Sequence, residues 1–520
     1  MLLPPRVQPT DISHGPRAEE APATCSRFLQ PLHAWKRLQV SYYGGKYSIE
    51  RVFALETYAR TTSLSRVFMV CLGTPMPMIT LVVLQELIPL QDPSEGWHAN
   101  DGFWIRTIIL AFVVGHTIIG QASYMVDGVE ISAIRLVLLS ACAATMFTVC
   151  AAAIIAYIIF PVPFFVLTMA PLFYLLLIIA VRFIVGRHII PHKEDMIPEA
   201  VIFTVDFFNT LYVATCMQSV SSVIAITAIS VTDLLQTCIM LYGLHRRTVW
   251  IRPRLHEATN NPSGTNCVLT LASSLCRDIG KFSRQDRHGI RIRSCLVHRI
   301  SEINEIHLQS LENIPEQQIE GIASDVNDVG PSGGKVQLRT HRAATWSLRL
   351  LCSRKRKDSV MPVLPSATSE RPKTIENRQK KRLTILTETL GALFTTECIV
   401  VASYLEAIVP LFYCDYIVLM VRLPSAQYHT EMAEVTQDNV GATVFPVLIF
   451  GLLQFVSFGI LVVVIERNFG LQALYQLAFV LETQMSLIQG KLIMWMVVTF
   501  SFRVIHFGMD FTYKFAWIKS

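Results

Sequence analysis

Three ionisable side chains lie in the last hydrophobic segment of the chain, Trp495–Phe511, at the spacing of one helical face. Arg503 precedes His506 by three residues, and His506 precedes Asp510 by four, so on a helix all three share one face. A charge near the centre of a bilayer costs roughly 2.5–3.5 kcal/mol on insertion scales, so such groups usually face the bundle interior or a water-filled cavity. Protonatable side chains in that setting are what a proton-coupled carrier would need.

Other polar side chains interrupt other hydrophobic segments. Asp206 and Asn209 are three residues apart, which places them on one helical face. Glu406 follows Glu397 by nine residues, so these two cannot share a face of a straight helix. The candidate binding residues are Asp206, Asn209, Asp233, Glu397, Arg503, His506 and Asp510. The alternative is that they tie helices together through buried hydrogen bonds, each typically below about 1–2 kcal/mol, which is the favoured role for His116.

Catalytic and metal-binding motifs are missing from the sequence. It has no H-E-x-x-H for zinc and no G-x-S-x-G nucleophile elbow. The stretch "GPSGGK" lacks the spacing of a P-loop, and "HIIPH" (188–192) contains a proline that argues against a helical metal site. We therefore predict no enzymatic activity, no bound metal and no cofactor.

The composition indicates how these polar groups are positioned. Of the 520 residues, 52% are hydrophobic and only 16% are charged, whereas a soluble domain is about 25% charged. A helix needs about 20 apolar residues to cross a bilayer. We therefore predict an all-α polytopic membrane helix bundle of about nine spans, with a range of about eight to ten. The predicted spans are 67–90, 105–124, 136–160, 164–185, two within 199–244 divided near 218–222, 393–413, 440–465 and 492–511.

Four regions follow from this pattern. Residues 1–47 form a disordered tail, and residues 48–245 form a first membrane half with about six spans. Residues 384–520 form a second half with three or four spans, depending on whether 471–488 is a span or an interfacial helix. The segment that begins at Tyr47 has helical apolar spacing, which fits a helix on the membrane surface or one packed on the protein itself.

The region between the two halves, residues 246–383, is basic. It holds 25 Lys and Arg against 13 Asp and Glu, a net charge of +12. The positive-inside rule places such a region in the cytoplasm, and the membrane accounts for its charge without nucleic acid. Within it, residues 266–282 and 298–314 have helical apolar spacing. The stretch "WSLRLLCSRKRK" predicts contact with anionic lipid through Trp346, Arg354, Lys355, Arg356 and Lys357.

Several stretches together resemble a known family: "YSIERVFALETYARTTS", "ELIPLQDPSEGWHANDGFWIR", "FPVPFFVLTMAP", "VIFTVDFFNTLYVATCMQS" and "LYGLHRRT". They are similar to a large family of multi-pass membrane proteins of unknown function in oomycetes. The resemblance covers both membrane halves and the start of the basic region. It implies a membrane-embedded fold and brings no activity with it. In that family further hydrophobic sequence separates the segments that this chain joins through "RHIIPHKEDMIPE".

Two functions remain open at this point. The intramembrane acids favour a transporter or channel for a small polar solute or ion. The alternative is a membrane-anchored scaffold or signalling protein, in which the basic region binds a cytoplasmic protein partner and the spans hold it at the bilayer.

Overall fold

The computed structural model describes the chain over most of its helices. The described residues are 45–92, 95, 99–125, 131–157, 194–196, 199, 201–219, 223–259, 267–281, 289–312, 373–432, 434–501 and 503–504. The predictions for the tail before residue 45, the span 164–185, the lipid-binding stretch at Trp346 and Arg354 to Lys357, and His506 with Asp510 lie outside them.

Within the described residues the protein is all-α, as predicted. Six helices there are long and apolar enough to cross a membrane. They are α3 (Leu64–Gly73) continued by α4 (Met76–Glu86), α5 (Asp101–Met125), α6 (Ala133–Tyr157), α10 (Val223–Thr259), α13 (Lys373–Met420) and α14 (Val440–Phe469). The predicted division near 218–222 is confirmed, because α9 (Phe207–Ser219) ends and α10 begins there.

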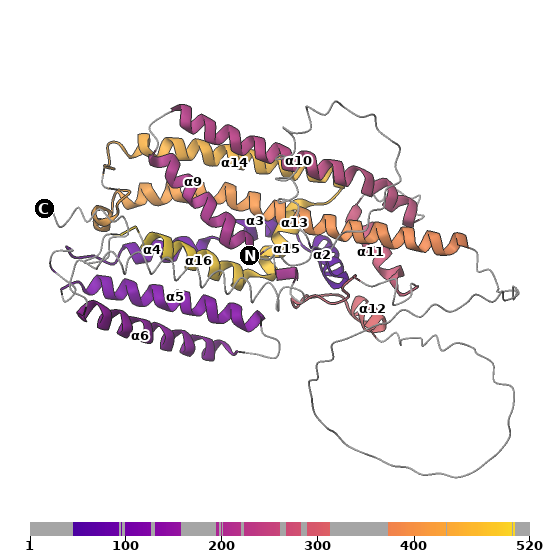
Figure 1. Ribbon diagram of the computed structural model, residues 1–520, viewed down its shortest axis with the longest axis horizontal. Coiled ribbons are helices and arrows are strands. Elements are labelled where there is room, and N and C mark those ends of the chain that lie inside the picture. The colour runs from indigo at the N-terminus through magenta and orange to yellow at the C-terminus, as the bar shows by residue number, and fades with distance from the viewer. Residues whose placement is uncertain are drawn as a thin grey trace, which may run out of the picture.

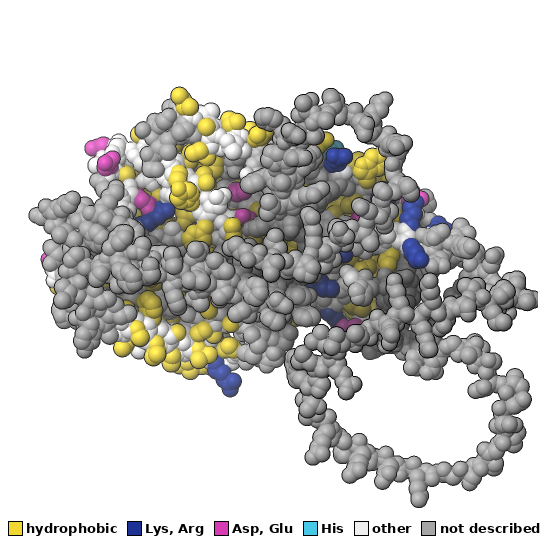
Figure 2. Space-filling view, viewed as in Figure 1, with side chains coloured by type: hydrophobic (Ala, Val, Ile, Leu, Met, Phe, Trp, Pro, Cys, Tyr) yellow, Lys and Arg dark blue, Asp and Glu magenta, His cyan; other side chains and the backbone are white. Residues whose placement is uncertain are grey.

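The helix α13 is the centre of the bundle. Of its membrane-length stretch 83% is buried, compared with 11% for α6 and 12% for α10. In Figure 1 the helices run along the long axis with α13 between α10 and α14 on one side and α4 and α16 (Met485–Ser501) on the other. Figure 2 shows hydrophobic side chains over the α5–α6 face and over the α10–α14 face, as lipid-facing surfaces require.

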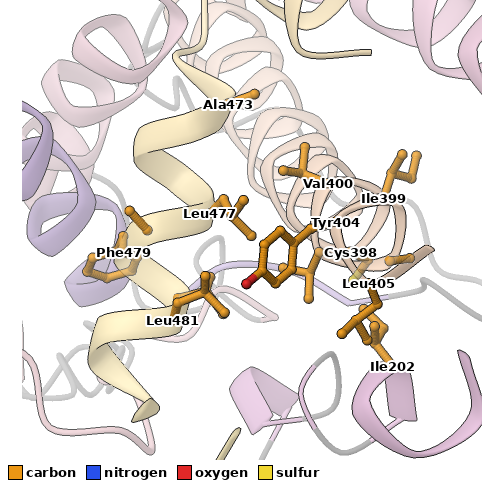
Figure 3. Close-up of a cluster of buried hydrophobic side chains, with 14 of the residues drawn as sticks. Ile202, Cys398, Ile399, Val400, Tyr404, Leu405, Ala473, Leu477, Phe479 and Leu481 are labelled. Carbon is orange, nitrogen blue, oxygen red and sulfur yellow. The ribbon is translucent and has the colours of Figure 1, made fainter. Parts of the chain in front are cut away.

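Two helical segments of the bundle are broken. Pro75 follows α3, and because proline has no N–H the chain restarts as α4. The segment 471–488 is not one continuous helix, because α15 (Ala473–Thr483) ends at Gln484 and α16 begins at Met485. At about 1.5 Å per residue, α15 is too short to cross a bilayer. Leu477 and Leu481 of α15 face Val400 and Tyr404 of α13 (Figure 3).

The segment that begins at Tyr47 packs on the protein rather than on the membrane surface. Its helix α2 (Ile49–Thr61) starts at Ser48, whose hydroxyl accepts from the Arg51 N–H. Every residue from Ile49 to Glu56 is buried, and Tyr47, which we assigned to the tail, is fully buried as well. The ordered core therefore begins before residue 48.

The basic region is also part of the packed structure. The predicted helices are confirmed as α11 (Val268–Arg277) and α12 (Glu302–Glu312). The buried side of α11 lies against α2, and the backbone N–H groups of Ile49 and Glu50 donate to the carbonyls of Arg291 and Ile292. Figure 1 places α2, α11 and α12 together at the end of the bundle where α10 and α13 extend furthest.

Candidate functional site

A cavity with both apolar and polar lining residues lies between α9, α10, α13 and α14. Its volume is about 300 Å³, and each of the four helices contributes to its wall. The apolar part of the wall is Val213, Ala228, Ile229 and Phe450. The polar part is Asn209, Thr210, Thr232, Gln236, Glu406 and Gln454.

The helical repeat explains why these residues meet. On α10 the lining positions Thr232 and Gln236 are four residues apart, and on α14 Phe450 and Gln454 have the same spacing, so each pair lies on one helical face. Thr210, Phe450 and Gln454 are buried and form the floor, whereas Asn209, Thr232 and Gln236 are exposed. The cavity therefore opens on the side where α9 and α10 lie.

One of the lining residues of the cavity is charged. Among the described lining residues Glu406 carries the only formal charge, and Lys, Arg and His do not occur there. Three carboxamides and two hydroxyl groups surround it, and these can both donate and accept hydrogen bonds. The arrangement can bind a small polar solute without forming or breaking a covalent bond.

The predicted site residues divide between this cavity and other places. Asn209 lines the cavity. Asp206 does not; it ends a π-helical turn, Ile202–Asp206, and its carboxylate Oδ2 is buried with no partner among the described residues. A π turn leaves one residue out of the α-helical repeat and is common at functional sites. The structure places Asp233 on α10 without describing its side chain.

Glu397 belongs to a buried ionic network at the end of the bundle near α2. Arg51 Nη2 donates to Glu397 Oε1 at 2.7 Å, and Arg51 Nη1 donates to the Asp195 carbonyl at 2.9 Å. The Arg51 side chain is 1% exposed and both carboxylates are 0% exposed. Tyr47 donates to the second oxygen of Glu397 and accepts from Gln476 Nε2 at 2.9 Å.

Asp195 links this network to the basic region. Arg291 Nη2 lies 2.8 Å from Asp195 Oδ1, and Ser294 Oγ donates to Asp195 Oδ2 at 2.7 Å. The positive charges of Arg51 and Arg291 thus balance the negative charges of Asp195 and Glu397, as buried charges require. The network joins α2, the 194–196 turn, the 289–301 segment and α13 into one unit.

The pKa values of two groups in this network follow from their burial and from the charges beside them. Burial by itself would raise the pKa of the Asp195 carboxyl, but Arg51, Arg291 and the Ser294 hydrogen bond outweigh it and hold that pKa below its usual value. Burial, followed by the nearby charge of Arg51, lowers the pKa of His298 to about 4. His298 is therefore neutral at pH 7, with Nε2 3.1 Å from Ser294 Oγ and its ring stacked on Phe479.

A second buried network lies at the opposite end of the bundle. Glu86 Oε2 accepts from Arg106 Nη1 at 2.8 Å and lies 3.0 Å from His429 Nε2. Arg106 Nη2 also donates to the Ile88 carbonyl at 2.6 Å, and Ser425 Oγ donates to the Glu86 carbonyl at 2.9 Å. These contacts join the end of α4, the start of α5 and the segment that follows α13.

Arg503 belongs to this second end, and the predicted helical stripe is corrected there. The helix α16 ends at Ser501; Arg503 is in a turn, and Val504 pairs with His429 in an antiparallel bridge. Arg503 Nη1 lies 2.5 Å from Glu431 Oε1, and the Arg503 carbonyl accepts from the Thr430 N–H. Arg503 therefore lies beyond the end of α16, and its partners lie on the loop that follows α13.

Two smaller polar pairs lie between helices. His116 Nδ1 is 3.3 Å from Ser140 Oγ, which joins α5 to α6, as the structural role expected for this histidine requires. Lys491 of α16 and Glu199 form a buried ion pair at 2.7 Å. Neither pair lines the cavity, and within the described residues no group of His, Cys, Asp and Glu could hold a metal ion.

Sequence reasoning missed most partners in these networks because they are far apart along the chain. Arg51 and Glu397 are separated by 346 residues, and Arg291 was counted only as part of the basic region. One signal was available in the sequence: Glu50 and Arg51 are charged residues within a segment of helical apolar spacing. The structure shows that this part of the helix is buried. Of the amides and hydroxyls of the cavity only Asn209 was predicted; Thr210, Thr232, Gln236 and Gln454 were not.

Comparison with family models, curated proteins and solved structures finds no match to this chain. The resemblance to the oomycete membrane proteins therefore stays a prediction.

Proposed function

We propose that this chain is a multi-pass membrane protein that transports a small polar solute or ion, and that the cavity between α9, α10, α13 and α14 is its binding site. The observation that carries the proposal is a cavity with six polar lining residues, among them Glu406 of α13 and Gln454 of α14, two membrane-length helices. At 1.5 Å per residue, Glu406 lies about 21 Å along α13 from Met420, and Gln454 lies about 21 Å along α14 from Val440. Both depths fall inside a hydrocarbon core about 30 Å thick.

The free-energy cost of placing polar groups in a membrane supports a functional role for them. A polar or charged side chain at that depth is costly, and it is found where it faces a partner, a cavity or a pathway. The two buried ionic networks close the bundle at its ends, one around Arg51 and one around Glu86, with the cavity between them along α13.

A flux assay tests the proposal. The purified chain is reconstituted in liposomes, and uptake is measured for Na⁺, Rb⁺, Cl⁻, protons and a panel of amines, amino acids and sugars. We expect at least one solute to move faster than in protein-free liposomes, with Glu406→Gln reducing that flux at least tenfold. The matched control is Glu466→Gln, an exposed carboxylate on α14 outside the cavity. Protein-specific flux that Glu406→Gln leaves unchanged, or no flux at all, refutes the cavity as a transport site.

A scaffold role is the second candidate, and one observation favours it. Ile303 and Ile306 on α12 are 80% and 61% exposed, and Val297 just before the helix is 96% exposed. These side chains lie in the basic region, outside the membrane-length helices, where apolar exposure is typical of a protein contact. If the protein is a scaffold, the double change Ile303→Ser and Ile306→Ser should abolish partner binding. Glu406→Gln should leave partner binding intact.

A further inference from the structure

We infer that the C-terminal half of α10 carries a binding site for anionic phospholipid headgroups, formed by Tyr242, Arg246, Val249 and Trp250. This inference goes beyond the proposed transport and does not depend on it, because it requires only that α10 is embedded in a bilayer. It starts from one side of α10 that is exposed along most of the helix.

The exposed side of α10 is a single helical stripe. Val231, Leu235, Tyr242, Arg246 and Trp250 follow one another at intervals of four or seven residues, which places them on the same side of the helix. All five side chains are exposed, and Trp250 is 66% exposed. The rest of the protein therefore leaves this stripe uncovered, and its contacts must come from outside the chain.

The order of side chains along the stripe matches the layers of a bilayer. Ile224, Val231 and Leu235 are exposed and apolar. At 1.5 Å per residue, Tyr242 lies about 27 Å along α10 from Ile224, and Arg246 lies about 6 Å further on. The hydrocarbon core is about 30 Å thick, and aromatic residues are enriched where it meets the headgroups. Tyr242 and Arg246 therefore fall at that boundary.

The neighbouring helix α14 shows the same change from apolar to basic side chains. Ile460 and Val463 are exposed, and Arg467, four residues after Val463, is exposed in the last turn. Figure 1 shows α14 running alongside α10 and ending beside it before α10 itself ends. Two helices thus place the edge of the hydrocarbon core at the same end of the bundle.

Arg246 has the chemistry to bind a phosphate group. Further along α10, Arg254 pairs with Glu388, whereas Arg246 forms no ion pair or hydrogen bond within the described residues. A guanidinium group presents several N–H donors in a planar fork that matches the oxygens of a phosphate. The positive-inside rule predicts that this end of the bundle is cytoplasmic, and the cytoplasmic leaflet is the one that carries anionic lipids.

The side chains beside Arg246 favour a lipid over a soluble anion or a protein. Tyr242, Val249 and Trp250 are 61%, 38% and 66% exposed, and such side chains fit the boundary layer, where one end of an aromatic ring is apolar and the other is wet. A soluble anion would leave them uncovered. A protein partner would bind beside turns of α10 that the bilayer already covers.

Photo-crosslinking tests the site. The full-length purified protein with Val249→p-benzoylphenylalanine is reconstituted in nanodiscs of phosphatidylcholine that contain phosphatidylglycerol as the minor, anionic lipid. After irradiation, mass spectrometry identifies the lipid attached to residue 249. We expect phosphatidylglycerol to exceed its share of the bilayer at least fivefold, about the factor that one basic residue contributes near an anionic surface.

Matched variants locate the preference. Val231→p-benzoylphenylalanine, on the same side of α10 within the hydrocarbon core, should give the two lipids in the proportions of the bilayer. Adding Arg246→Gln to the residue 249 reporter should reduce the enrichment about fivefold. Adding Arg299→Gln, an exposed arginine just before α12, should leave it unchanged. A salt concentration of about 1 M, where the Debye length is about 3 Å, should also reduce it.

Three results would overturn the inference. The first is an absence of lipid adducts at residue 249, which would place this part of α10 outside the bilayer. The second is an enrichment of phosphatidylglycerol that survives Arg246→Gln. The third is a protein rather than a lipid as the main adduct of residue 249 when intact cells are irradiated, which would assign the stripe to a protein contact. None of these results bears on the flux assay, so transport stands or falls separately.

Discussion

At the residue scale, three buried ion pairs in the described part of the chain carry no net charge. Arg51 with Glu397, Arg106 with Glu86 and Lys491 with Glu199 are each nearly inaccessible to water. A buried ion pair is weak evidence for stability, because desolvation offsets much of the attraction, but breaking one by removing a single partner leaves an uncompensated charge. Glu406 lies elsewhere, in the wall of the cavity between α9, α10, α13 and α14.

Arg51 tests the cost of an unpaired charge. Arg51→Leu leaves Glu397 without its guanidinium and should destabilise the folded protein by about 3–5 kcal/mol. It should therefore lower Tm and the yield of monodisperse protein in detergent. The double change Arg51→Leu and Glu397→Leu should recover most of the loss, because Asp195 keeps Arg291 as a partner. Arg135→Leu, at an exposed position, is the control; equal losses at both arginines would show that the pair is not stabilising.

His298 should make stability depend on pH. Its folded pKa of about 4 lies below the unfolded value of about 6.5, so the unfolded state binds the proton more readily. The contribution of neutral His298 to the free energy of unfolding is fully present above about pH 6.5 and is lost as the pH falls toward 4. At pH 5 the loss is about 2 kcal/mol. Between pH 7.5 and 5, His298→Gln should therefore lose less Tm than the wild type. The exposed His245→Gln should behave like the wild type; a similar rescue by it would contradict the assignment.

At the element scale, two short buried helices have related sequences. "VFALET" (52–57) lies in α2 and "AFVLET" (478–483) lies in α15; α2 is followed by the apolar helices α3 and α4, and α15 by the apolar helix α16. The two helices contact each other, since Tyr58 Oη donates to Glu482 Oε2 at 2.8 Å and its ring lies 5.6 Å from that of Phe479. The matching glutamate of α2, Glu56, accepts from Ser273 and pairs with Arg277 of α11. In both helices the glutamate thus bonds to a residue of a neighbouring element.

A close contact between α13 and α14 depends on a glycine. A Cβ atom at Gly451 would lie 3.0 Å from Leu411 Cδ2 and 3.3 Å from Pro410 Cβ. Gly451→Val should therefore lower Tm, with an overpacking cost of about 1–3 kcal/mol. Gly459→Val on the same helix meets nothing within 4 Å and controls for helix propensity. Equal Tm changes in the two variants would exclude tight packing as the cause.

At the scale of the whole molecule, the two ends of the bundle differ in charge and in composition. One end carries α2, α11, α12 and the extensions of α10 and α13, and the other carries the α4–α5 connection and the loop between α13 and α14. The positive-inside rule predicts that the first end is cytoplasmic. Cys276, within the basic region, cannot report this, because it is fully buried and burial raises the pKa of its thiol to about 12.

Introduced cysteines at exposed positions test the topology. Val297→Cys, at a side chain that is 96% exposed, should react with an impermeant maleimide only after the cells are permeabilised. Asp438→Cys, exposed in the loop at the opposite end, should react in intact cells. The wild-type chain gives the background from its own cysteines. Labelling of Val297→Cys in intact cells at the level of Asp438→Cys would overturn the orientation.

Hydrophobicity and helical periodicity were sufficient for the class of fold. Both are local properties, so a window of about 20 residues reveals a membrane-length helix without knowledge of its neighbours. The division at α9 and α10 and the helices α11 and α12 were predictable for the same reason. The one predicted cavity residue in the described structure, Asn209, was found because a polar side chain in an apolar segment is itself a local signal.

Only the tertiary structure decided which polar groups meet. Asp195, Arg51, Arg291 and Glu397 come from four separate segments, and their pairing depends on packing, which no window of sequence contains. Tertiary contacts also hold Arg503 beyond the end of α16, where Glu431 and Thr430 on a neighbouring loop are its partners. The same holds for the cavity: Thr232, Gln236 and Gln454 are ordinary residues of apolar helices, and only the meeting of α9, α10, α13 and α14 turns them into one polar wall around Glu406.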